Sequence, residues 1–294
     1  MRSRLIAASL VAAFSAATPS HADAWGFDAH KYIMARAINL LPAPLRPYFE
    51  ANRAFLIERA IDPDLWRTAG WEEESPRHYV DMDAFGAYPF ADLPHDYEAA
   101  VQKFGKEMVE KNGTLPWRTE EIYKKLVEAF EQKAPYARDN VRLFSAIITH
   151  YVSDAQVPFH ASLNHDGQLT GQWGIHSRFE SELFERYRAQ LRVMPKPVVP
   201  VPNARELIFD SLTSAFTHVQ PVLDADKIAT EGREFYDDGY FRMMFARVRP
   251  ILEARLAESI TRAASVINAA WIEAGRPPLP VKAPARQPRK IRRS

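Results

Sequence analysis

The segment HYVSDAQVPFH, from His150 to His160, combines a helical pattern with three potential metal ligands. His150 and Asp154 are four residues apart, so in a helix both side chains lie on one face. Pro158 would end or bend that helix and turn His160 in a new direction. Because histidine and carboxylate side chains at this spacing can bind one metal ion together, the segment predicts a helix that carries a metal site at its end.

A second pair of the same kind follows in HSRFE, residues 176–180. His176 and Glu180 are again four residues apart and share one helix face. A single pair of this kind is also typical of a surface ion pair. Two pairs and a further histidine within 31 residues favour a metal site instead. His150 also lies in the most apolar segment of the chain, where an unpaired histidine is costly.

The hydrophobic pattern is helical nearly throughout the chain. Residues 137–156 are strongly apolar and predict a central buried helix, whereas 29–42, 95–111, 119–133 and 174–191 are amphipathic. Two further helical segments are expected at 204–227 and 241–274, and only the short segment 197–202 resembles a strand. The pattern predicts an all-α fold, a single multi-helix domain.

The N-terminus has the pattern of an export signal. Arg2 and Arg4 precede an apolar run, residues 5–17, that is shorter than the ~20 residues a membrane-spanning helix needs. Ala22-Asp23-Ala24 then offers small residues for a signal peptidase. We expect residues 1–24 to be a signal peptide, Trp25 to be the mature N-terminus, and the protein to be periplasmic or secreted. An uncleaved N-terminal anchor is the alternative.

Composition limits the classes of function. The chain has 294 residues and no cysteine, so an exported form has no disulfides and needs a large core, bound metal or both. Residues 25–275 carry a net charge of about −7, which argues against a domain that binds long nucleic acid through charge alone. Residues 276–294 are rich in proline and arginine, have seven basic and no acidic residues, and are expected to form a disordered tail.

Further ligands are available upstream. The segments DPDLWR and PRHYVDMD supply Asp62, Asp64 and His78. A free α-amino group loses its proton near neutrality, so the amine and carbonyl of a mature Trp25 could chelate a metal, with His30 one helical turn further on.

Together these residues resemble the superfamily that contains zinc-dependent bacterial phospholipase C and the single-strand-specific fungal nucleases. The resemblance rests on Trp25, His30, an aspartate before His78, and the two segments 150–160 and 176–180. It implies an all-α protein with three zinc ions bound in a cleft, and it makes residues 25–275 a zinc-dependent phosphodiesterase domain.

The resemblance also implies three ligand sets. The first consists of Asp64, His78, His150 and Asp154. The second consists of His160, His176 and Glu180. The third consists of the amine and carbonyl of Trp25, His30 and Asp154, so that Asp154 bridges two ions. Asp64 is preferred to Asp62 because the residues after it fit the family better, and it is also the candidate catalytic residue, as the acceptor of a proton from water.

The expected activity is hydrolysis of phosphate ester bonds, with a phospholipid or a single-stranded nucleic acid as the phosphodiester substrate. Glu180 and the short step from His160 to His176 favour a phospholipase C, whereas HYVD after SPR resembles the nucleases. A secreted zinc-binding protein without turnover is the alternative from another class. We expect a monomer, with peripheral membrane contact if lipid is the substrate.

Other residues attract simpler interpretations. The run Glu72–Ser75 is expected to be a solvated loop. His165 lies in the loop between ligands and is expected to be exposed, with a position in the cleft as the alternative. His95 and His218 are interpreted as ordinary surface or core residues because no partner is evident. Aromatic residues flank the ligands and could stack a base, hold a lipid headgroup or pack in the core; they are Trp66, Trp71, Tyr79 and Phe85.

Overall fold

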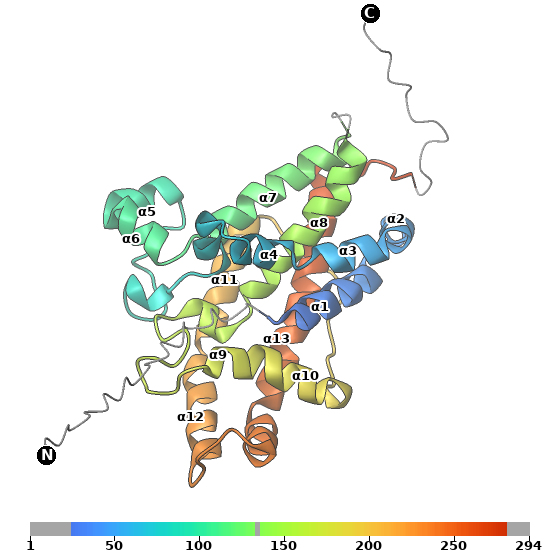
Figure 1. The fold of residues 1–294 in the computed structure, drawn as a ribbon. Coiled ribbons are helices and arrows are strands. Elements are labelled where there is room, and N and C mark those ends of the chain that lie inside the picture. Colours follow the sequence, from blue (N-terminus) through green and yellow to red (C-terminus); the bar gives the residue numbers. More distant parts are fainter. Residues whose placement is uncertain (1–24, 133–135, 281–294) are drawn as a thin grey trace, which may run out of the picture.

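The computed structural model describes residues 25–132 and 136–280, which form a helical domain without strands (Figure 1). The all-α prediction is therefore confirmed for these residues. The expected signal peptide, 1–24, and residues 281–294 of the expected tail lie outside them. The α-helices are α1 Phe27–Leu40, α2 Arg46–Ala51, α3 Arg53–Arg59, α4 Asp62–Thr68, α5 Tyr97–Phe104, α6 Lys106–Lys111, α7 Leu115–Phe130, α8 Ala137–Asp154, α9 Ile175–Ser177, α10 Leu183–Tyr187, α11 Ala204–Phe216, α12 Val219–Thr230 and α13 Asp238–Glu273.

Helix α8 is the centre of the domain, as its apolar sequence predicts. It packs against α7 and the long helix α13, and α1 and α3 cover its other side (Figure 1). Every residue from Ser145 to Asp154 is buried, so the C-terminal half of α8 lies wholly inside the protein. Polar side chains at that end of α8 must therefore find partners inside the protein.

Short irregular turns carry the rest of the site. Two 3-10 helices, Glu72–His78 and Pro158–Ala161, follow α4 and α8, and a π-helical turn, Arg178–Glu182, joins α9 to α10. Pro158 begins the turn after α8, as expected from its fixed φ and missing N–H. These turns place ligands from distant parts of the sequence around the end of α8.

Some boundaries differ from the sequence pattern. Residues 95–111 form two helices, because Gly105 has a φ of 87°, which interrupts the α-helix. The break between α11 and α12 falls before Pro221, which lies in the first turn of α12. Residues 197–202 are not a strand. None of the described helices combines the length and the apolar character needed to cross a membrane.

Candidate metal centre

The site is built on the buried end of α8. His150 and Asp154, one helical turn apart, are both fully buried. The Nδ1–H of His150 donates to the Ala60 carbonyl oxygen at 2.8 Å, which fixes the ring and leaves Nε2 facing Asp154 Oδ2 at 3.2 Å. The second nitrogen of His150 is thus oriented by a hydrogen bond made on the opposite side of the ring, as is usual for metal-binding histidines.

Two more ligands complete a four-atom group at this position. His78 Nδ1 lies 3.1 Å from His150 Nε2 and 3.0 Å from Asp154 Oδ2. Asp64 Oδ1, from α4, lies 3.7 Å from His78 Nδ1 and 3.8 Å from His150 Nε2. Nitrogen and oxygen ligands of a tetrahedral zinc ion are separated by about 3.3–3.6 Å, because each lies about 2.0–2.2 Å from the metal. This first donor set therefore has dimensions that suit zinc.

The other oxygens of the two carboxylates face His30. His30 Nε2, on α1, lies 3.3 Å from Asp154 Oδ1 and 3.9 Å from Asp64 Oδ2. The His30 ring stacks on that of His150, with centroids 3.9 Å apart. Asp154 thus directs one oxygen to His30 and the other to the first donor set, which is the arrangement of a bridging carboxylate.

Trp25 is held next to this second group. Its ring is fully buried, and its indole N–H donates to the Ser153 carbonyl oxygen at 2.9 Å. The Ser153 hydroxyl lies 3.0 Å from His30 Nδ1. Ser153 therefore fixes both the start of the described chain and the ring of His30, a role that the sequence pattern did not reveal.

A separate donor set lies on the turns after α8. His176 Nε2 is 3.0 Å and His160 Nε2 is 3.9 Å from Glu180 Oε2. The Nδ1–H of His160 donates to the carbonyl oxygen of His78 at 2.6 Å. The His160 ring of this set is therefore hydrogen-bonded to the backbone of His78, which belongs to the first donor set.

Burial prepares several histidines for metal binding. It lowers the pKa of His30 to about 3 and that of His160 to about 4, and it lowers the pKa of His176 well below its usual range. Neutral imidazole is the form that binds metal, so these rings are ready at neutral pH. Burial also opposes the charge on His150, but the carboxylate of Asp154 and a second carboxylate outweigh it and raise the pKa of His150 to about 9. Metal binding at His150 must release a proton.

The orphaned atoms fit a cation. Within the described part of the chain, His30 Nε2, Asp64 Oδ2 and Asp154 Oδ1 are buried without a hydrogen-bond partner. A buried polar atom without a partner costs about 1–3 kcal/mol. The three atoms lie close together, because His30 Nε2 is 3.3 Å from Asp154 Oδ1 and 3.9 Å from Asp64 Oδ2. A bound cation would satisfy all three, so the residues present fit zinc.

Three groups of donors thus have the mutual distances of a metal site. Eight of the nine predicted ligands contribute a side chain to them, and the ninth, Trp25, lies beside His30 through Ser153. Asp62 belongs to none of these groups; its carboxylate instead lies 3.5 Å from Arg59. Asp64 is fully buried among the donors, and Arg67 Nη2 lies 3.3 Å from its Oδ1.

The expectation of a solvated loop at Glu72–Ser75 is wrong for Glu74. This residue lies in the 3-10 helix that carries His78 and is buried. Its carboxylate accepts hydrogen bonds from the hydroxyl of Tyr151 and, at 2.6 Å, from Arg77. Glu74 therefore links the 3-10 helix that carries His78 to α8, because Tyr151 belongs to α8 and directly follows His150 in the sequence.

The remaining histidines and aromatic residues contribute no donor to the three groups, although His165 lies close enough to His176 for its charge to lower the pKa of that ring. His95 has partners that its sequence context did not suggest: it pairs with Glu206 at 2.5 Å and stacks on Phe209. His165 is exposed, as expected. Trp66 and Trp71 stack on each other with centroids 5.8 Å apart, Trp71 is largely exposed, Phe85 is in the core and Tyr79 is half-buried.

An all-α domain in which histidine and carboxylate donors form three buried groups defines a helical protein suited to binding several metal ions. The family model for zinc dependent phospholipase C matches residues 29–220, which is 192 of the 294 residues. The chain therefore belongs to the zinc-dependent phospholipase C family. A comparison with curated proteins gives no match. Family membership and the buried donor groups are compatible with zinc, and the family relates the chain to hydrolases of phosphoester bonds.

Proposed function

We propose that the protein is an exported phospholipase C that binds three zinc ions and cleaves the phosphodiester bond of a phospholipid. The observation that carries the proposal is the convergence of three buried donor groups, two of which share His150, with Asp154 directing one oxygen to His30 and the other to His78. The first ion would be held by Asp64, His78, His150 and Asp154. The second would be held by His160, His176 and Glu180. The third would be held by the Trp25 amine and carbonyl, His30 and Asp154.

The chemistry follows from the charge of the substrate. Zinc ions at close spacing bind phosphate oxygens, lower the pKa of a bound water and stabilise the leaving oxygen. The protein contributes a rigid, buried set of donors and a carboxylate, Asp64, that can accept a proton from the attacking water. Burial raises the pKa of Asp64, while the neighbouring rings of His150 and His78 lower it. Arg67, at 3.3 Å, orients the Oδ1 of that carboxylate.

The loop between His160 and His176 favours a lipid substrate. Leu163, Leu169 and Trp173 all project from it into solvent. Two of its polar side chains turn inward instead, whereas His165 and Thr170 are exposed: Gln168 donates to the Leu163 carbonyl oxygen at 2.6 Å, and Asn164 accepts from the Leu169 N–H at 2.8 Å. In most surface loops the polar side chains are exposed and the large apolar ones are buried, which is the opposite of what these residues show.

This inverted loop, residues 162–174, is continuous with the donor set that contains His160 and His176. Tryptophan and leucine are side chains that enter the boundary between water and lipid, where tryptophan is especially enriched. Three divalent ions would offset most of the net charge of about −7 on residues 25–275, and a domain that is close to neutral suits a zwitterionic surface. Peripheral contact of the loop with phosphatidylcholine is therefore part of the proposal.

Export is proposed from the first 24 residues. A free amine exists at Trp25 only after cleavage behind Ala24, so removal of the signal would complete the third donor set. The buried indole of Trp25 and its hydrogen bond to Ser153 support a fixed position for that amine beside His30.

One experiment tests the proposal directly. Zinc per chain is measured on protein purified from the periplasm or medium, and hydrolysis is assayed on phosphatidylcholine vesicles, single-stranded DNA, RNA and 3′-nucleotides. We expect three zinc ions and preferential cleavage of phosphatidylcholine. His150→Ala, Asp154→Ala and His160→Ala should each lose zinc and activity. Preferential cleavage of single-stranded DNA would assign the nuclease function, and zinc without any hydrolysis would assign a binding protein.

A further inference from the structure

Arg178 lies between two proposed ligands in sequence but points away from them in space. His176 and Glu180 share one helix face, and the residue midway between them, two positions from each, lies on the opposite face. Arg178 is 4% exposed, on a helical turn whose other face carries ligands. A buried arginine needs partners for its charge and for its five N–H groups.

The guanidinium of Arg178 is bound on every side. Its Nε donates to the Tyr240 hydroxyl at 3.0 Å, and its Nη1 donates to the Trp173 carbonyl oxygen at 2.7 Å. Its Nη2 lies 3.2 Å from Asp226 Oδ1. The ring of Tyr236 lies against the guanidinium, 3.9 Å from centroid to Cζ. One side chain thereby joins the ligand turn to α12, to α13 and to the end of the loop before α9.

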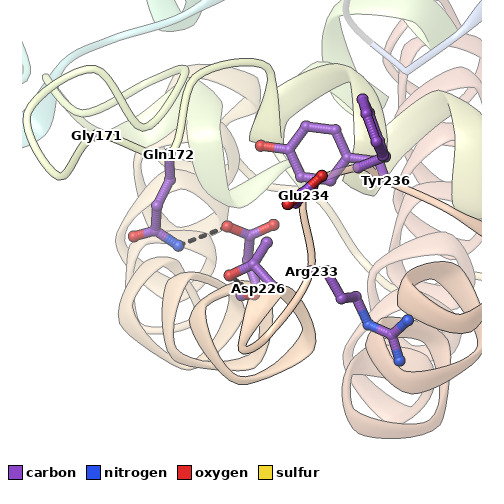
Figure 2. Close-up of a pocket in the computed structure, with 8 residues that line it drawn as sticks. Gly171, Gln172, Asp226, Arg233, Glu234 and Tyr236 are labelled. Atoms are coloured by element: carbon purple, nitrogen blue, oxygen red, sulfur yellow. Dashed lines mark hydrogen bonds between the residues drawn. The ribbon is translucent and has the colours of Figure 1, made fainter.

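Asp226 belongs to the same hydrogen-bond network. It is buried, accepts from the Tyr240 hydroxyl and from Arg178, and accepts from Gln172 Nε2 at 2.7 Å (Figure 2). Gln172 also donates to the Leu223 carbonyl oxygen at 2.8 Å. The outer side of the network lines a surface cavity of about 280 Å³. The network therefore lies between this cavity and the ligand turn.

The ligand turn needs such support because of its backbone. Residues Arg178–Glu182 form a π-helical turn, which is rare and is found mostly as single turns at functional sites. The turn also lies against Gly26: a Cβ at position 26 would meet the Ser181 hydroxyl at 2.5 Å. The turn that carries Glu180 thus contacts both the start of α1 and the Arg178 network.

We propose that Arg178 is a positioning residue that holds His176 and Glu180 in the geometry that binds zinc. The inference rests on the proposed function for the identity of these two ligands. Arg178 touches neither substrate nor metal and acts through the turn. Loss of its forked hydrogen bonds would let the π-helical turn relax toward an ordinary α-helix and move Glu180 relative to His176 and His160.

The test compares two lysine substitutions. Arg178→Lys keeps the charge but loses the fork that reaches Tyr240, Asp226 and Trp173 together. Arg262→Lys is the matched control, since Arg262 also joins two helices, donating to the Leu207 carbonyl oxygen and the Ser211 hydroxyl, and belongs to no donor group. Zinc affinity is measured by competition with a chromophoric chelator, and folding is measured by thermal unfolding of both zinc-free variants.

We expect Arg178→Lys to weaken zinc binding at one of the three sites by about 10- to 100-fold, the range usual for residues that orient metal ligands. The other two sites and Arg262→Lys should keep wild-type affinity, and excess zinc should restore the activity of Arg178→Lys. Tyr240→Phe, which removes one hydroxyl from the network, should shift the same site in the same direction and is the variant to use if Arg178→Lys does not fold.

Several results would overturn the inference. These are wild-type affinity at every site in both Arg178→Lys and Tyr240→Phe, equal weakening of all three sites, or an equal loss in Arg262→Lys. A wild-type protein that binds zinc but hydrolyses no phosphodiester would refute the proposed function and leave the comparison of Arg178 with Arg262 intact. A wild-type protein that binds no zinc would refute both.

Discussion

Replacing Leu169 and Trp173 together with serine should weaken binding to phosphatidylcholine vesicles without affecting the chemical step. Both side chains are largely in water, at 69% and 63% exposure, and neither contributes a donor to the metal groups. The double variant therefore separates access to a lipid surface from hydrolysis itself.

The expected loss follows from the apolar area available for insertion. Full burial of a leucine is worth about 1.5–3 kcal/mol, and a tryptophan buries about 150–250 Å² at about 25 cal/mol per Å². Scaled to the exposed fractions and to insertion of about half of each side chain, the two residues supply about 2–3 kcal/mol of binding. Because 1.4 kcal/mol corresponds to tenfold, vesicle partitioning should fall about 30- to 140-fold.

Vesicle sedimentation measures the partitioning, and a small water-soluble phosphodiester measures the chemistry. The soluble substrate should be hydrolysed at the wild-type rate. The matched control is Tyr136→Ser with Met194→Ser, because these side chains are 72% and 81% exposed and lie on other segments of the chain. Equal partitioning of the loop variant and wild type would refute the reasoning, as would an equal loss in the control or on the soluble substrate.

Three further outcomes are expected. Asp64→Asn should lose far more activity and zinc than Asp62→Asn, since only Asp64 lies among the donors; the reverse order in metal analysis and assay would move the ligand to Asp62. In chelator, unfolding monitored by circular dichroism should show a loss of about 2 kcal/mol at pH 5 from each of His30 and His160, because folding lowers their pKa values from 6.5 to about 3 and about 4. The contribution of His150, whose pKa folding raises to about 9, should be lost instead as the pH rises from 6.5 through 9. Stability that is constant between pH 6.5 and pH 5 would contradict the burial of His30 and His160 in the neutral form. Protein with a free amine at Trp25 should bind one more zinc and be more active than either the uncleaved precursor or a form with one added methionine, as measured by zinc per chain; equal zinc and equal activity in the three forms would remove the amine from the ligand set.

Features set by local sequence could be predicted. The apolar periodicity of residues 137–156 predicts α8 and its burial, since a helix that is apolar on most faces must lie inside the protein. The four-residue spacing of His150 and Asp154 likewise places both side chains on one face, and the structure shows them 3.2 Å apart. A local pattern is sufficient in both cases, because helix geometry alone relates the residues.

Features that depend on distant partners could not be predicted. By sequence, Glu74 is one member of an acidic run that is expected to be exposed. It is buried because the folded chain places Tyr151, 77 positions later, against its carboxylate. Arg178 reads as a spacer between two ligands, because its partners Asp226 and Tyr240 are 48 and 62 positions away. Neither pairing leaves a periodic signal, so the candidate ligands could be predicted from the sequence, whereas Glu74 and Arg178 could not be given a role.

The carboxylate of Asp154 makes two donor groups thermodynamically dependent on each other. One carboxylate carries only one negative charge, so two cations held by its two oxygens would share that charge and repel each other. The group of His160, His176 and Glu180 contains no part of this carboxylate. In a zinc-poor environment the protein should therefore lose one ion of the Asp154 pair before the other, so that its molecules are partly loaded in a fixed order.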